Sequence, residues 1–236
     1  MEHIKKDNKL SIIIPTINEA RNLPILLADI RSYTQCLEVI VIDCGSTDST
    51  TLVAKIGGAK VIAMTNKNRG EQLHTGAMSA NGNWLFFLHA DSRLKYNWKS
   101  KIINLISNPL SKQYAWYFNF KTEKKGFIWF ILELAVYIRS NLFNSPYGDQ
   151  GLLLSKELYS RIGGYKEIPI MEDLDLITRL KQITTLRSLG SGIETNSRKY
   201  LGSNIIKNAI KNALLRYQWR KGANINELAK RYYAEN

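Results

Sequence analysis

The chain has 236 residues, 44% of them hydrophobic, and a formal net charge of +13 at pH 7. This length and apolar content predict one domain with a sizeable core, and two cysteines are too few for a disulfide-rich secreted scaffold. The N-terminal segment lacks the apolar stretch of a signal peptide, which favours a cytoplasmic protein. The charge indicates an anionic partner such as a phosphorylated small molecule, nucleic acid or lipid.

Short apolar strands alternate with helices over the first half of the chain. The predicted strands are 10–14, 38–43, 59–64 and 84–90, and the predicted helices are 19–33, 47–57 and 70–80. We expect Pro15 to end the first strand. Continuous apolar strands separated by helices predict an α/β fold, with a mostly parallel central sheet and helices on both faces.

The alternation of strands and helices ends after residue 110. The pattern predicts a strand at 114–120, an apolar helix at 127–141 and an amphipathic helix near 205–220. We therefore expect a single domain over residues 1–236. Its parts are a nucleotide-binding half (about 9–110), an acceptor and catalytic half (about 111–200) and a helical C-terminal extension (about 201–236).

Polar residues follow three of the predicted strands at the point where each strand ends. They form the segments 15–19, 43–46 and 89–91. Because ligands of an open α/β sheet bind at the carboxyl ends of its strands, we expect these segments to converge on one ligand. Asp43 precedes the turn, so helix capping does not explain it, and its carboxylate can accept hydrogen bonds from a base or ribose.

Four segments, in order along the chain, resemble the family 2 glycosyltransferases, which are nucleotide-sugar enzymes of the A-type fold. The segments are SIIIPTINEA, VIDCGSTDST, NRGEQLHTGAMSANGNWLFFLHAD and GGYKEIPIMEDLDLITRLK. The resemblance implies a nucleotide diphosphate sugar as the donor, a UDP-sugar before others. The residues that we assign to the donor are Pro15, Thr16, Asn18, Glu19, Asp43, Arg69, Gly70, His89, Ala90, Asp91, Arg198 and Lys199.

The family's fourth strand normally ends in an Asp-x-Asp motif that holds a divalent cation. Here His89 takes the first acidic position and only Asp91 remains. Mg²⁺ uses one or two carboxylates together with substrate phosphates, so the implied cofactor is Mg²⁺ or Mn²⁺ at Asp91 and His89. A bacterial subgroup of the family resembles this chain in its His-Ala-Asp and in the segment 148–151. In that segment we expect Asp149 and Gln150 to face the acceptor.

The segment MEDLDL supplies the second acidic site. Helical spacing puts Asp173 on the apolar side of a first turn, beside Glu172, and capping alone does not require an inward carboxylate. The resemblance implies that Asp173 is the general base of an inverting displacement. The Gln-x-x-Arg-Trp motif of processive synthases is absent, so we expect transfer of one sugar.

Two other classes of protein fit the sequence less well. A nucleotidyltransferase needs a glycine-rich basic loop after the first strand, whereas this chain has PTINEARN there. A nucleic-acid-binding protein would explain the charge, but the basic residues are spread along the chain and no recognition motif occurs. We therefore expect no nucleic-acid partner.

Two helices raise the question of a membrane contact. The apolar run 127–138 is shorter than the roughly 20 residues of a spanning helix and contains Glu133. It and the basic helix 205–220 are able to rest on anionic lipid at the inner face of a membrane and meet a lipid-linked acceptor. We expect instead that both helices pack on the sheet.

Overall fold

The computed structural model describes residues 9–31, 37–95, 97–195 and 205–234. Its strands are β1 (Leu10–Thr16), β2 (Leu37–Asp43), β3 (Lys60–Ala63), β4 (Trp84–Phe87), β5 (Ser92–Leu94), β6 (Ala115–Thr122), β7 (Leu152–Ser155) and β8 (Leu186–Thr195). Its α-helices are α1 (Leu23–Arg31), α2 (Thr50–Ile56), α3 (Arg69–Met78), α4 (Trp98–Ser107), α5 (Phe127–Asn141), α6 (Lys156–Arg161), α7 (Glu172–Ile183), α8 (Ile205–Arg220) and α9 (Ile225–Ala234).

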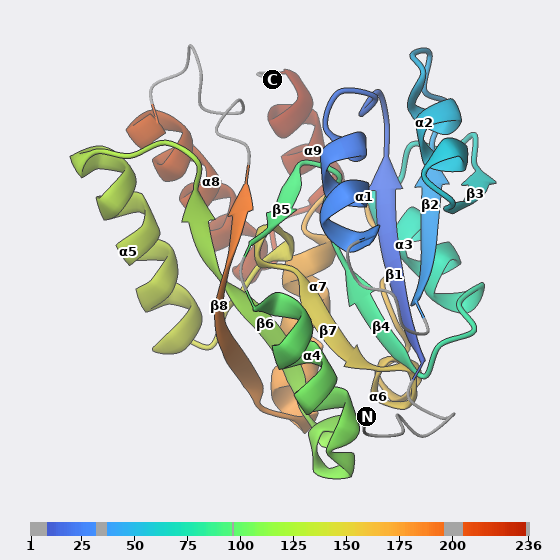
Figure 1. Ribbon diagram of the computed structural model, residues 1–236. Helices are drawn as coiled ribbons and strands as arrows, with labels where there is room; N and C mark the ends of the chain where they lie inside the picture. The colour runs from blue at the N-terminus through green and yellow to red at the C-terminus, as the bar shows by residue number, and fades with distance from the viewer. Residues whose placement is uncertain (1–8, 32–36, 96, 196–204, 235–236) are drawn as a thin grey trace.

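The strands form one eight-stranded sheet in the order β3-β2-β1-β4-β7-β6-β8-β5 (Figure 1). β1 to β4 are parallel, and so are β6 and β8, whereas β7 runs antiparallel to both of its neighbours and β5 runs antiparallel to β8. The predicted mainly parallel α/β fold is confirmed. The antiparallel strands β7 and β5 lie only in the second half of the sheet. β7 follows the end of the simple alternation of strands and helices in the sequence, whereas β5, at residues 92–94, precedes it and was not predicted.

The core consists of two apolar layers, one on each face of the sheet. Side chains of β4 alternate between them: Trp84 and Phe86 pack with α1 and α4, and Leu85 and Phe87 pack with α3, α6 and α7. All four are buried, which explains why this strand is apolar at every position and not only at every second one.

The prediction that Pro15 ends the first strand is wrong, because β1 continues to Thr16 and Pro15 pairs with Ile42 of β2. The carbonyl group of Ile13 accepts a hydrogen bond from the amide of Leu88, so odd-numbered residues of β1 direct their amide groups towards β4. β4 ends at Phe87, and the missing N–H of Pro15 therefore removes no hydrogen bond from the sheet.

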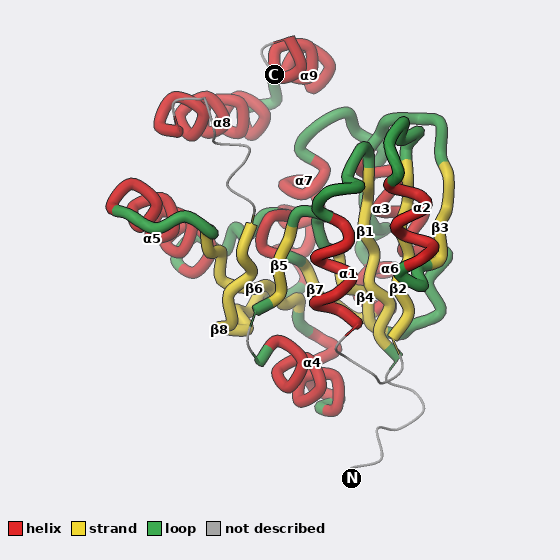
Figure 2. The backbone as a smooth tube through the Cα atoms, turned by 45° about the horizontal axis from the view of Figure 1, so that its top comes forward, coloured by secondary structure: helices red, strands yellow, loops and turns green. Residues whose placement is uncertain are grey.

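The expectation that both late helices pack on the sheet is met by α5 on one face and is wrong for α8. α5 contacts β6, but only Val136 and Ser140 of its 15 residues are buried. α8 packs with α9 around Leu215 and Leu228, and this pair contacts Ile170 in the loop before α7. Figure 2 shows α8 and α9 beyond the end of the sheet at which β1 ends, and α5 at the edge of the molecule.

Candidate active site

A cavity of about 630 Å³ lies at the carboxyl ends of β1, β2 and β4, and we call it the strand-end cavity. Loops from three strands and the first turn of α3 converge on it, as the sequence predicted. Seven of the residues assigned to the donor line it: Pro15, Thr16, Glu19, Arg69, His89, Ala90 and Asp91. A cavity at this edge of an α/β sheet is the usual place for a ligand.

Asp43 and Asn18, two further residues assigned to the donor, do not line this cavity. Asp43 is 3% exposed, and its carboxylate accepts hydrogen bonds from the Thr16 hydroxyl at 3.0 Å and from the Ser46 amide at 2.9 Å. Asn18 has a φ of 54°, and its side-chain carbonyl accepts from the Thr47 amide at 2.8 Å. In this arrangement both residues hold the first two strand-end loops together.

The start of α3 forms another wall of the cavity. Asn68 caps the helix by accepting from the amide of Glu71 at 3.0 Å, which aims the first turn at the strand ends. Gly70 does not face the cavity: a Cβ atom there would lie 2.1 Å from the carbonyl oxygen of Lys166, so glycine permits close packing. Sequence reasoning missed Gln72, which is buried and donates to the carbonyl groups of Thr16 and Ile42 at 3.1 and 2.9 Å.

His89 and Asp91 lie at the end of β4, with Nδ1 of His89 3.9 Å from an Asp91 carboxylate oxygen. Within the described ranges, no group of three or more His, Cys, Asp or Glu side chains could hold a metal ion. A carboxylate and an imidazole are nevertheless suitable donors for Mg²⁺ or Mn²⁺ when substrate phosphates supply the remaining ligands. The donor set at this strand end therefore fits a cation that binds together with a nucleotide.

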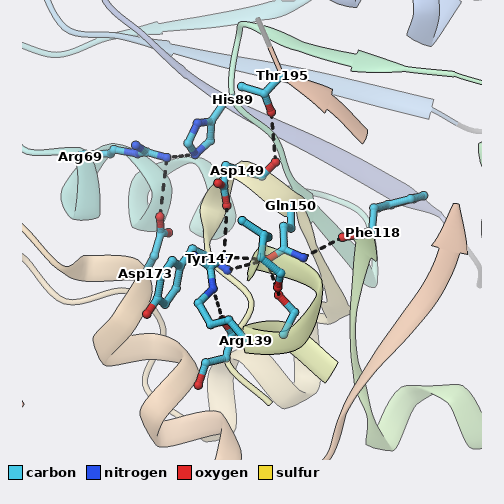
Figure 3. A network of polar contacts seen from close by, with 12 residues as sticks. Arg69, His89, Phe118, Arg139, Tyr147, Asp149, Gln150, Asp173 and Thr195 are labelled. Atoms are coloured by element: carbon cyan, nitrogen blue, oxygen red, sulfur yellow. Dashed lines mark hydrogen bonds and ion pairs between the residues drawn. The ribbon is translucent and has the colours of Figure 1, made fainter. Parts of the chain in front are cut away.

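Arg69 connects the strand end to the start of α7, as Figure 3 shows. Its guanidinium group contacts Nε2 of His89, and it lies 3.3 Å from Glu172 and 3.8 Å from Asp173. The sequence assigned these four residues to two separate sites. The structure brings them together around one cation.

Glu172 and Asp173 open α7 after Met171, a residue with a φ of 65°. Burial and the neighbouring Asp173 raise the pKa of Glu172 to about 7, although Arg69 opposes the shift. The side chain of Asp173 is more accessible, at 18% against 10% for Glu172. The two acids thus differ in environment, and Asp173 is the one better placed to exchange a proton with a ligand.

Two neighbours orient the Asp173 carboxylate. The Tyr165 hydroxyl donates to Oδ1 at 3.2 Å, and burial raises the pKa of that phenol far above its ordinary value, so it remains a donor. Gly148 lies against the other oxygen: a Cβ atom at residue 148 would be 2.2 Å from Oδ2 and 2.7 Å from Nε2 of His89. A side chain at residue 148 would therefore displace one or both of these functional groups.

The predicted acceptor residues Asp149 and Gln150 occupy a short 3-10 helix, Gly148–Gln150. Gln150 is 1% exposed, and its amide binds the Arg139 guanidinium, the Ser140 hydroxyl and the Phe118 carbonyl group at 2.8 to 3.1 Å (Figure 3). This position does not support direct contact with an acceptor. Asp149 is 4.0 Å from Arg139, and its backbone carbonyl group accepts from Thr195.

A second cavity, of about 380 Å³, lies over the start of α7, and we call it the α7 cavity. Asp173 and Glu172 line it together with Arg216 of α8 and Tyr233 of α9. Arg69, Pro169 and Tyr233 line both cavities, so the two spaces adjoin. The C-terminal helices thus form a wall of the site, which no motif in the sequence indicated. Arg198 and Lys199, the remaining residues assigned to the donor, lie outside the described residues.

Residues 11–151 match the family model for glycosyl transferase family 2. The chain belongs to this family. A human relative, dolichyl-phosphate beta-glucosyltransferase, is 31% identical in an alignment of 105 residues that covers 37% of this chain and 32% of that protein. A Mycobacterium bovis relative, a PGL/p-HBAD biosynthesis glycosyltransferase, is 39% identical over 92 residues, 36% of each chain. The chain thus spans about a third of the length of these curated relatives.

Solved structures share the fold at low sequence identity. The mannosyltransferase PcManGT from Pyrobaculum calidifontis, in complex with GDP-Man and Mn²⁺, has a TM-score of 0.66 and 15% identity over 92% of this chain and 65% of its own. This likeness confirms the A-type glycosyltransferase fold implied by the sequence motifs.

Proposed function

We propose that this chain transfers a single sugar from a nucleoside diphosphate sugar to an acceptor hydroxyl, with inversion at the anomeric carbon. One observation carries the proposal: the strand-end cavity adjoins a second cavity lined by Asp173, with Arg69 on both linings. A donor in the first space and an acceptor in the second would meet at this carboxylate. We favour a UDP-sugar, as the sequence motifs imply.

The proposed step is one displacement. The acceptor oxygen forms a bond to the anomeric carbon while Asp173 takes its proton, and the bond from that carbon to the diphosphate breaks with its electron pair on the leaving group. General-base assistance of this kind contributes roughly 10²- to 10⁴-fold. The guanidinium group of Arg69 lies 3.8 Å from the Asp173 carboxylate. Tyr165 holds one carboxylate oxygen in place.

Asp91 and His89 would hold Mg²⁺ or Mn²⁺, which when bound would offset the charge of the diphosphate. Support comes from the donor types at this strand end and from PcManGT, whose structure contains Mn²⁺. Glu172, with a pKa raised to about 7, is the second candidate for the general base.

The His-Ala-Asp sequence and the glycine pair at 148 and 151 support membership of the bacterial subgroup. We also propose that residues 1–236 act as one domain.

We also propose that α5 rests on an anionic membrane surface on the cytoplasmic side. Seven large apolar side chains of α5 are 38–80% exposed and lie at helical spacing, and we call them the α5 stripe: Phe127, Ile128, Phe130, Ile131, Leu134, Tyr137 and Ile138. Lys124 and Lys125 are exposed just before the helix, and the net charge is +13. An apolar stripe flanked by lysines is typical of helices that lie in an anionic interface. No helix within the described residues is long and apolar enough to span a membrane.

Calorimetry tests the donor site directly. We expect UDP to bind with Mg²⁺ or Mn²⁺ and to bind more weakly in chelator. Because a ligand that binds only the native state raises stability by mass action, the melting temperature should rise in parallel. If neither UDP nor GDP binds with either metal, the proposed function is wrong.

A further inference from the structure

A third cavity, of about 940 Å³, lies between α5, α7 and α8, and we call it the basic cavity. Four cationic side chains line it: Arg139, Lys181, Arg216 and Arg220. Over the described part of the chain, the one ion pair formed by this set joins Arg139 to Asp149, at 4.0 Å. Four positive charges thus line one space, and among the described residues one carboxylate, that of Asp149, lies within 4.0 Å of them.

Packing holds these cations at the cavity wall. The guanidinium carbons of Arg139 and Arg216 lie 3.7 and 5.2 Å from the centre of the Tyr147 ring. The Lys181 ammonium group donates to the Phe143 carbonyl group at 2.8 Å. Burial and the charge of Arg220 lower the pKa of Lys181, as expected when like charges are gathered in partly desolvated positions. A bound anion would relieve this repulsion.

The basic cavity also adjoins the proposed reaction centre. Tyr147 and Arg216 line both it and the α7 cavity, which Asp173 lines. Thr178 of α7 lines the basic cavity and is five positions after Asp173, about 7.5 Å along the helix axis. A small group bound among the cations would therefore lie between one and two helical turns from an acceptor oxygen at Asp173.

We propose that the basic cavity binds a phosphate group carried by the acceptor, and so positions the acceptor hydroxyl at Asp173. The inference rests on the proposed function and names the acceptor's chemical class. Guanidinium groups match phosphate geometry with two parallel hydrogen bonds, and a phosphate dianion offsets the charge excess better than a carboxylate does. Phe143, Tyr217 and Trp219 add apolar walls for the rest of the acceptor.

The test measures binding of glycerol 3-phosphate, a soluble phosphate monoester, by calorimetry. The protein is first saturated with UDP and Mg²⁺, so that the strand-end cavity does not compete for the probe. We expect saturable binding to the wild type, and a loss of at least about tenfold in the double variant R216Q/R220Q, because two charged hydrogen bonds disappear. The control K55Q/K230Q removes two exposed lysines of α2 and α9 and should bind like the wild type.

A second variant distinguishes loss of phosphate binding from misfolding. R216K keeps the charge but loses the paired hydrogen bonds, so it should bind better than R216Q when both have the wild-type melting temperature. Absence of saturable binding to the wild type would overturn the proposal. Equal losses in R216Q/R220Q and K55Q/K230Q would also overturn it, because only nonspecific charge would then be involved.

The source of the phosphate is distinguished with vesicles. Phosphatidylcholine vesicles with phosphatidic acid present a lipid phosphate monoester, and those with phosphatidylglycerol present a phosphodiester. If the acceptor is a lipid, R216Q/R220Q should lose binding to the first kind more than to the second; if it is soluble, the variant should lose glycerol 3-phosphate only. Equal, undiminished binding of every probe by the variant overturns the proposal. UDP binding is measured separately, so failure of the donor site and failure of the basic cavity are distinguishable.

Discussion

The strand-end cavity and the α5 stripe are opposite kinds of surface on one domain. At the strand ends, buried polar groups are hydrogen-bonded to each other: Asp43 to Thr16, and Gln72 to two backbone carbonyl groups. On α5, apolar side chains are exposed, with Phe127 at 80% and Phe130 at 61%. The first surface is preorganised for a small polar ligand, whereas the second is suited to an apolar partner such as the interior of a lipid layer. The difference teaches that the two surfaces would recognise their partners by different physical means.

Among the substitutions predicted here, replacing Asp173 by Asn should have the largest effect on the transfer rate. The amide keeps the size of the side chain but takes no proton, so the transfer rate should fall by roughly 10²-fold or more. UDP binding and the melting temperature should stay near wild type. The control Glu157→Gln removes an exposed acid from the first turn of α6 and should keep full activity. An active Asp173→Asn enzyme would move the base to Glu172.

Replacing Asp91 by Asn tests whether the strand end holds a cation. UDP affinity measured with Mg²⁺ should fall about 10- to 100-fold, and affinity in chelator should change little. Equal losses in the two conditions would show that Asp91 does not hold the metal. His89→Asp recreates the family's usual motif and should retain metal-dependent binding; loss of that binding in a folded variant would show a specific role for the histidine.

Replacing Phe127 by Ser tests whether the α5 stripe binds a membrane. Burying a phenylalanine side chain is worth about 1.5–3 kcal/mol, so binding to anionic vesicles should weaken about tenfold in a sedimentation assay. Stability should change by less than about 0.5 kcal/mol, since the side chain is 80% exposed. Ile56→Ser, at an exposed position of α2, is the matched control and should bind as wild type. The membrane proposal would be contradicted if the wild-type chain does not bind vesicles and instead forms dimers through α5.

The last prediction concerns Glu172 and the dependence of stability on pH. Burial raises its pKa from its usual value near 4.5 to about 7, so the folded state binds the proton more tightly than the unfolded state. This contribution to stability is present below about pH 4.5 and is lost as the pH rises to about 7. Urea unfolding at pH 5 and pH 8 should show the wild type losing stability relative to Glu172→Gln. An equal change in both proteins would show that folding does not raise the pKa of Glu172.

Much of the fold was predictable because its local patterns are strong. Apolar strands between helices predicted the parallel half of the sheet, and polar residues at the strand ends predicted the position of the strand-end cavity. Both patterns depend on short stretches of sequence. The role of Arg69 was only partly predictable: its place before a helix was clear, but its contacts with His89, Glu172 and Asp173 join segments about 20 and 100 residues away. Such distant contacts leave no local periodicity.

The α5 stripe shows a different limit of sequence reasoning. A helix with apolar residues at helical spacing is usually a core helix, and the sequence alone does not reveal whether an apolar face meets protein or lipid. Likewise, Tyr233 and Arg216 reach the site only because α8 and α9 pack around Leu215 and Leu228 beside the loop before α7. That packing depends on tertiary contacts between three segments.

Gly148 has a consequence for how the reaction could be halted. A methyl group there would press on the side chains of Asp173 and of His89, which belongs to one of the strand-end loops. Gly148→Ala should therefore disturb the meeting point of donor and acceptor, and also the donor contact proposed for His89. One added carbon atom would thus slow transfer through two side chains at once.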